Sequence, residues 1–227
     1  MGTIERMVLL ANSRKVGGCC VAGRALDGKA RPGRWLRPVG SQVAAGLPQA
    51  RTRYVDGSSA AVLDLVEIDL DQPVPHMHQR ENRLLGDSPW KRYGRIGWDR
   101  LACLADTDEC GLWVDGFSSS CGSNDRVPEP LLTQVAGSLH LIRTDSLHLF
   151  RDAGGYPQRK LRGAFSHAGQ NYVLAVTDPE AWSVLGGREE LALADAYLCI
   201  SLGVPFKGYA YKLMASVITE HRAKAAA

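Results

Sequence analysis

The densest group of side chains able to do chemistry lies between His76 and Asn82, which read H-M-H-Q-R-E-N. In an extended chain His76 and His78 project to the same side. With Glu81 they could supply nitrogen and oxygen ligands for a metal, or an acid–base pair. Alternatively, His78, Gln79, Glu81 and Asn82 contact a ligand, or tie a loop by hydrogen-bonding its backbone. The sequence leaves these three interpretations open.

A second group combines cations with an aromatic ring near the N-terminus. If residues 34–39 form a strand, Trp35 and Arg37 share one face, Leu36 lies on the other, and Pro38 ends the ladder. Arg and Lys neutralise phosphate and an indole stacks on a base, so the pattern is typical of a nucleic-acid surface. A hairpin with solvated charges and a core tryptophan explains it equally well. The candidate contacts here are Asn12, Ser13, Arg14, Lys15, Arg34, Trp35 and Arg37.

A third basic group lies in the second half of the chain. Arg159, Lys160 and Arg162 lead into a short apolar run and would extend the same basic track. Because such a surface neutralises several phosphates, its binding must weaken steeply with salt.

The elements that must position these residues are mainly strands. Apolar alternation and turn residues predict a hairpin over 7–26, with Arg14 and Lys15 in its loop. The Ser88-Pro89 pair predicts a helix start, and so does Asp178-Pro179. The remaining strands are expected at 34–39, 61–70, 138–143, 147–151, 161–167, 170–177, 197–202 and 209–219.

The arrangement of these elements indicates two domains. The stretch 106–130 is acidic and then rich in Ser, Gly and Asn, which is typical of a boundary. We therefore expect an N-terminal barrel with a helical insertion over 1–130 and a C-terminal barrel over 131–227. Several short strands and one helix in each half outline two small antiparallel Greek-key barrels of the OB type.

Composition describes an ordinary soluble protein, with 45% hydrophobic and 22% charged residues among 227. The net charge is +3, but the first 53 residues carry ten basic and two acidic side chains, so they contribute +8 and the remainder −5. No apolar run is long enough for a membrane span, and the first residues lack a signal-peptide pattern, so we expect a cytoplasmic protein. The six cysteines show no C-x-x-C spacing, which favours reduced thiols.

The order and spacing of several short blocks resemble the dual OB-containing domain family of prokaryotes. The blocks are L-A-N-S-R-K at 10–15, G-G-C-C-V-A-G at 17–23, W-L-R-P-V at 35–39, H-x-H-Q-x-E-N at 76–82, S-L-H-L-I at 138–142, Y-V-L-A-V-T-D-P at 172–179 and S-L-G-x-P-F-x-G-Y-x-Y-K-L at 201–213. The resemblance implies two fused OB-like barrels and nucleic-acid recognition in a conflict system such as anti-phage defence. It supplies no catalytic set.

Three functions follow from these observations. The preferred hypothesis is a non-enzymatic module, without a cofactor, that binds DNA, RNA or a nucleotide. In this hypothesis the basic residues contact phosphate, Trp35 stacks, and the 78–82 loop hydrogen-bonds bases or sugar. The alternatives are a metal-assisted hydrolase or nuclease using His76, His78 and Glu81, and an adaptor that meets a partner effector protein.

Overall fold

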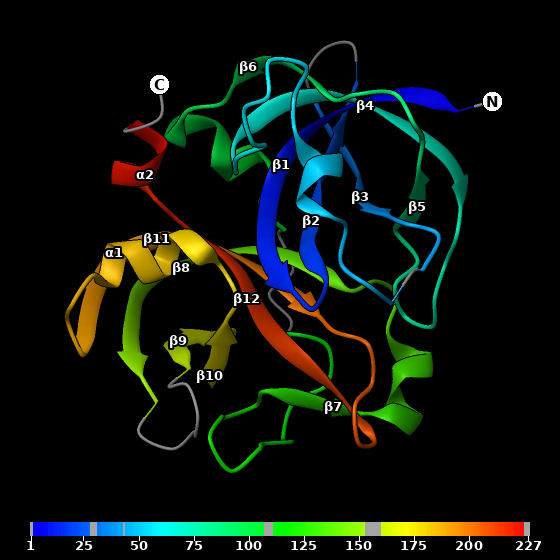
Figure 1. Ribbon diagram of the computed structural model, residues 1–227. Coiled ribbons are helices and arrows are strands. Elements are labelled where there is room, and N and C mark those ends of the chain that lie inside the picture. The colour runs from blue at the N-terminus through cyan, green and yellow to red at the C-terminus, as the bar shows by residue number, and fades with distance from the viewer. Residues whose placement is uncertain (1, 28–30, 43, 107–110, 153–159, 225–227) are drawn as a thin grey trace. The chain divides into compact units, whose positions relative to one another are not determined.

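The computed structural model describes residues 2–27, 31–42, 44–106, 111–152 and 160–224 (Figure 1). The chain divides into two compact units. The first contains the residues up to Leu104 and those from His221 onward, and the second contains Ala105–Glu220. Within the described residues no helix is both long and apolar enough to cross a membrane.

The first unit is a closed barrel built from the first five strands. Strand order is β1-β2-β3-β5-β4, and pairing between β4 and β1 closes the ring. The β3–β5 pair is parallel and the other pairs are antiparallel. A further strand, β6, extends the sheet from β4. The elements are β1 (Thr3–Lys15), β2 (Gly18–Leu26), β3 (Pro32–Val39), η1 (Gln49–Thr52), β4 (Asp64–Pro73), β5 (Asn82–Leu85), β6 (Lys91–Arg95), η2 (Trp98–Cys103) and, from the C-terminal residues, α2 (Glu220–Lys224).

The second unit repeats the same topology. Its ring runs β8-β9-β10-β12-β11 and closes through β11–β8, again with a parallel pair, β10–β12. A helix lies between the third and fourth ring strands of both units, η1 in the first and α1 in the second. Both rings have the topology of an OB-fold, which confirms the expected pair of barrels. The elements are β7 (Arg126–Pro128), η3 (Glu129–Gln134), β8 (Leu139–Arg151), β9 (Leu161–His167), β10 (Gln170–Val176), α1 (Pro179–Leu185), β11 (Glu190–Leu202) and β12 (Tyr209–Thr219).

Each barrel encloses its own apolar core. In β4 of the first barrel, Val66, Ile68 and Leu70 are fully buried and alternate with partly exposed residues. This period of two places one face of the strand inside the ring. In the second barrel Leu147 and Leu198 belong to a separate core cluster. The cores hold the strands whose outer faces carry the candidate site.

The expected first hairpin is confirmed, with β1 and β2 paired from Met7↔Ala25 to Lys15↔Gly18. Its turn is shorter than expected, so Arg14 and Lys15 end a strand and do not lie in a loop. Gly18 has a φ of +155°, and a Cβ on it would lie 1.9 Å from the Leu47 carbonyl oxygen. Only glycine allows the 46–47 segment to approach the hairpin this closely.

The expected hairpin between 138–143 and 147–151 is wrong, because β8 runs unbroken from Leu139 to Arg151. Pairing with β11 continues through the turn-like residues, with Ala194 opposite Ser146 and Ala196 opposite Thr144. Local bonds between Thr144 and Ser146 account for the turn-like composition without breaking the ladder.

The helix expected after Ser88-Pro89 is also wrong, because residues 91–95 form β6 against β4. The Ser88 hydroxyl donates to Asp69 at 2.8 Å and does not cap a helix. Trp90 is 1% exposed and packs in the first core. Burial of this indole and pairing with β4 outweigh the local helix-start pattern.

The units divide after Leu104, whereas composition favoured a division after residue 130. The Ser- and Gly-rich stretch is fastened to the second barrel. Lys212 donates to the Asp115 carboxylate at 2.7 Å, and β7 pairs with β12. This segment resembles a linker because it is rich in polar side chains. These carboxylates and hydroxyls instead form hydrogen bonds within the segment, as the Ser119 hydroxyl does when it donates to Asp125 at 2.6 Å.

Candidate nucleic-acid interface

The outer face of β2 and β3 carries the predicted aromatic ring. Leu36 is fully buried in the core, so Trp35 and Arg37 lie on the opposite face of β3, as expected. The Arg24 guanidinium of β2 lies 4.6 Å from the centre of the Trp35 ring and donates to the Gly33 carbonyl at 3.1 Å. This cation–π pair fixes a half-buried indole beside a positive charge.

Arg37 does not reach solvent, contrary to the expectation of a phosphate contact. It is 2% exposed, and its Nη1 lies 3.2 Å from Glu81 Oε1. Its backbone N–H also donates to the Glu81 carbonyl oxygen at 3.0 Å. The pair fastens the loop between β4 and β5 to β3, so the role of Arg37 in this conformation is structural.

The loop from 74 to 81 buries most of the polar residues that suggested chemistry. His76 and Gln79 exchange backbone hydrogen bonds at 2.9 and 3.2 Å across a tight turn. His78 and Gln79 are 2% and 3% exposed, and Asn82 is fully buried. These burials support the loop-tying interpretation over direct ligand contact. The turn instead presents Met77, which is 49% exposed.

The arrangement does not assemble the proposed metal site. Within the described ranges, no group of three or more His, Cys, Asp or Glu side chains is placed to hold a metal ion. His78 is buried while His76 is half-buried, and Glu81 is engaged by Arg37. The hydrolase hypothesis therefore lacks the geometry that it requires.

The tip of the first hairpin carries one exposed cation and one half-buried cation. Arg14 is exposed, and Val16 at the turn is 93% exposed. Burial lowers the pKa of Lys15; Cys20 opposes this shift, and the positive charge of Arg37 adds to it.

The side chains of Asn12 and Ser13 both lie against backbone carbonyl groups. The Asn12 amide donates to the Ala60 carbonyl at 2.8 Å, and the buried Ser13 hydroxyl lies 3.5 Å from the Cys20 carbonyl. Both side chains satisfy backbone groups, so neither matches the expected ligand contact.

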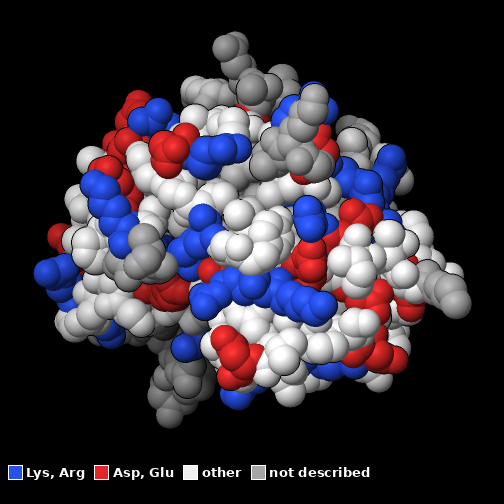
Figure 2. Space-filling model, turned by 90° about the horizontal axis from the view of Figure 1, so that it is seen from above, with Lys and Arg blue, Asp and Glu red and all other residues white. Residues whose placement is uncertain are grey.

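Ion pairs neutralise much of the basic N-terminal region. Arg34 pairs with Glu5, although the Arg34 side chain stays largely exposed. Nine of the ten basic residues in the first 53 are described, and at least five of them pair with carboxylates. These five are Arg6, Arg31, Arg34, Arg37 and Arg51. On the face shown in Figure 2, basic and acidic side chains are accordingly interspersed.

The second barrel supplies little of the expected basic track. Arg162 is 7% exposed and donates to Asp152 at 3.2 Å, which removes it from the surface. Lys160 is exposed, and Arg159 lies outside the described residues.

Sequence reasoning missed an aromatic contact in this barrel. Phe206 is 63% exposed in the loop between β11 and β12, and Lys207 Nζ lies 5.4 Å from its ring centre. This loop corresponds in topology to 74–81 of the first barrel. Phe206 and Tyr209 exchange backbone bonds, and Lys207 and Gly208 have positive φ. The signal in the sequence was an aromatic residue beside a lysine and a turn glycine.

Comparison with known proteins agrees with this geometry. The family model of the dual OB-containing domain matches residues 5–217, nearly the whole chain. No curated protein and no solved structure shows significant similarity to the chain. The matched span includes both barrels, whose ring strands follow the same order. The chain therefore belongs to the family of dual OB-containing domains.

Proposed function

We propose that this protein is a nucleic-acid-binding module and that both of its barrels bind single-stranded DNA or RNA. The observation that carries the proposal is an aromatic ring beside a cation in each OB barrel, Trp35 with Arg24 and Phe206 with Lys207. OB barrels commonly bind oligonucleotides through the face of their second and third strands and the flanking loops. Unpaired bases stack on such rings, whereas paired bases are hidden in a duplex.

Exposed cations elsewhere on the barrels would contact phosphate. In the first barrel they are Arg14 at the hairpin tip and Arg80 in the 74–81 loop, both exposed, with Lys15 half-buried. Arg37 and Glu81 would act indirectly by holding the loop in place. The family resemblance supports a setting in prokaryotic conflict or anti-phage defence, where a binding module senses foreign nucleic acid.

The test is fluorescence anisotropy with single-stranded and duplex DNA and RNA across a salt series. We expect single strands to bind more tightly, with affinity falling as salt rises. Replacing both Arg14 and Arg80 with alanine should weaken binding and reduce the salt slope by about one per lost phosphate contact. Phe206→Ala should cost about 1–3 kcal/mol if one base stacks on it.

The control is Arg6→Ala, which removes one positive charge from β1 at a residue paired with Glu67 on β4. This variant should bind as the unmodified protein does. If no polynucleotide binds even at low salt, or if Arg6→Ala and the Arg14/Arg80 variant lose affinity equally, the proposed function is wrong.

A further inference from the structure

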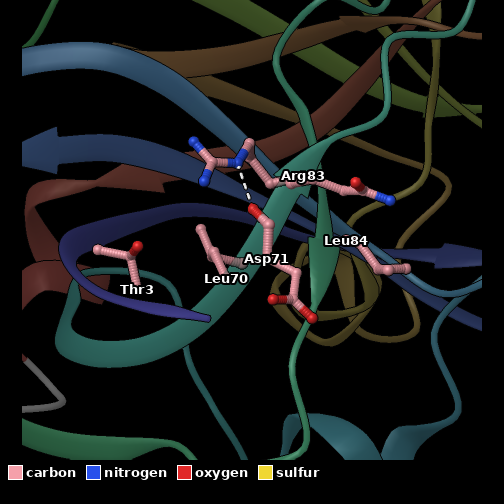
Figure 3. A pocket seen from close by; sticks show the side chains of 6 residues that line it. Thr3, Leu70, Asp71, Arg83 and Leu84 are labelled. Atoms are coloured by element: carbon pink, nitrogen blue, oxygen red, sulfur yellow. Dashed lines mark hydrogen bonds between the residues drawn. The ribbon is translucent and has the colours of Figure 1, made fainter. Parts of the chain in front are cut away.

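The first barrel contains a hollow of about 470 Å³ that is lined by residues of β1, β4 and β5 (Figure 3). It lies where the start of β1, the end of β4 and β5 meet. Its volume falls within the range of small-molecule sites. The lining residues are Thr3, Leu70, Asp71, Gln72, Arg83 and Leu84.

An irregularity in β4 shapes this hollow. Leu70 pairs with Leu85, but Pro73 pairs with Arg83, so β4 has one residue more than β5 between these pairs. Such a bulge bends the strand and turns side chains out of the regular alternation. Asp71 lies within the bulge and reaches the hollow.

The bulge also holds the Arg83 guanidinium in a fixed orientation. Arg83 Nε donates to the Asp71 backbone carbonyl at 2.8 Å, as the dashed line in Figure 3 shows. Within the described part of the chain, this is the one hydrogen bond of the Arg83 side chain, so its two terminal nitrogens are without a protein partner. A planar guanidinium anchored through Nε presents two parallel donors, the geometry that recognises an oxyanion.

The Asp71 carboxylate is the second charged group that lines the hollow. It points away from the guanidinium in Figure 3, and no hydrogen bond or ion pair joins it to another described residue. Arg83 and Asp71 are both half-buried. Two opposite charges that line one hollow without pairing are available for two different groups of one ligand.

We infer that this hollow binds a nucleoside 5′-phosphate, either free or as the end of a strand. Arg83 would hold the phosphate through its terminal nitrogens, and Asp71 would accept hydrogen bonds from the ribose hydroxyls. Leu84 offers an apolar wall, and Leu70 forms the floor. The choice of a nucleotide as the ligand rests on the proposed nucleic-acid function.

The test is isothermal titration of the full chain with AMP, adenosine, 2′-deoxy-AMP and inorganic phosphate. We expect AMP to bind most tightly, because among these probes it alone offers a phosphate to Arg83 together with both ribose hydroxyls to Asp71. Arg83→Ala should weaken AMP binding at least about tenfold. Arg83→Lys should not restore it, because an ammonium lacks both the Nε anchor and the forked donors. Asp71→Asn should reduce the preference for AMP over 2′-deoxy-AMP.

Arg6→Ala is the control, since it removes a largely exposed arginine that is paired with Glu67 and should leave AMP binding unchanged. Thermal melting checks that each variant folds. If Arg83→Ala does not fold, the Asp71→Asn variant still tests the inference. The inference is overturned if phosphate binds as tightly as AMP, or if Arg83 and Asp71 variants bind AMP normally. Polynucleotide binding without AMP binding would overturn only this inference, whereas AMP binding without polynucleotide binding would overturn only the proposed function.

Discussion

Two arginines that looked like phosphate contacts are buried beside carboxylates. Arg37 faces Glu81 and Arg162 faces Asp152, with all four side chains at most 8% exposed. Removing one partner of such a pair leaves an uncompensated buried charge, which is more costly than losing an exposed ion pair. The sequence cannot distinguish a buried arginine from an exposed one when both sit in alternating strands.

Arg37→Ala should therefore act on stability. We expect its free energy of unfolding, measured by urea denaturation, to fall by about 3–5 kcal/mol because Glu81 loses its buried partner. The exposed Arg14→Ala should change it by less than about 0.5 kcal/mol. If Arg37→Ala is as stable as Arg14→Ala, the buried ion pair does not fasten the loop.

Tyr54 should make stability fall at high pH. Burial raises its pKa above the ordinary value of 10.0, and the hydrogen bond that it donates to Asp64 at 2.6 Å adds to this shift. Because the folded state keeps a proton that the unfolded chain loses, this stabilisation is present below pH 10.0 and is lost as the pH rises. Relative to Tyr54→Phe, the unmodified protein should lose about 1.4 kcal/mol per pH unit above that value.

Urea denaturation of both proteins across this pH range measures the difference, and groups common to both, such as Lys212 and Tyr172, cancel. Phenolate absorbance provides a second check, since the Tyr54 ring should ionise only when the barrel unfolds. Parallel pH profiles for the two proteins would contradict the assignment.

At the scale of the element, the helix α1 is predicted correctly because its start pattern and its tertiary contacts agree. Asp178 Oδ1 accepts the Glu180 N–H at 3.0 Å as an N-cap, while Oδ2 accepts the Val217 N–H of β12 at 2.8 Å. One buried carboxylate thus joins the helix to β12 of the second barrel.

Asp178→Ala should lower the free energy of unfolding by about 2–4 kcal/mol. About 1 kcal/mol comes from the lost cap, and the rest from leaving the buried Val217 N–H without an acceptor. Ser183→Ala, at an exposed position of the same helix, should change stability by less than about 0.5 kcal/mol. Equal stabilities of the two variants in urea would show that Asp178 does not join helix and strand.

The elements that the sequence failed to predict are those in which local and tertiary preferences disagree. Ser88-Pro89 matches a helix start, yet burial of Trp90 and pairing with β4 make β6. Thr144 to Ser146 matches a turn, yet β11 pairs along the whole of β8. The 76–82 cluster was found by its composition, but its burial depends on the Arg37–Glu81 pair, which no periodicity reveals.

For the whole molecule, the sequence indicates two OB-type barrels, but the pairing of the strands within each barrel comes only from the structure. Strand lengths and connections differ between the barrels, but both have the same strand order and one parallel pair, β3–β5 in the first and β10–β12 in the second. Each barrel has its own core cluster. Because the cores are separate, we expect one barrel to unfold locally while the other stays folded.

The cysteines can test this independence in the whole protein. Cys199 is fully buried in β11, Cys19 and Cys20 are half-buried in β2, and Cys103 and Cys121 are exposed. Peptide mapping after brief alkylation should show Cys103 and Cys121 modified first, and Cys199 only when the second barrel opens. Asp178→Ala should speed Cys199 modification about thirtyfold or more, in line with its loss of stability, and leave Cys19 and Cys20 unchanged. Arg37→Ala should speed the modification of Cys19 and Cys20 and leave that of Cys199 unchanged. If either variant accelerates all three thiols equally, the two barrels open as one cooperative unit, and nucleic acid bound to one barrel would stabilise both.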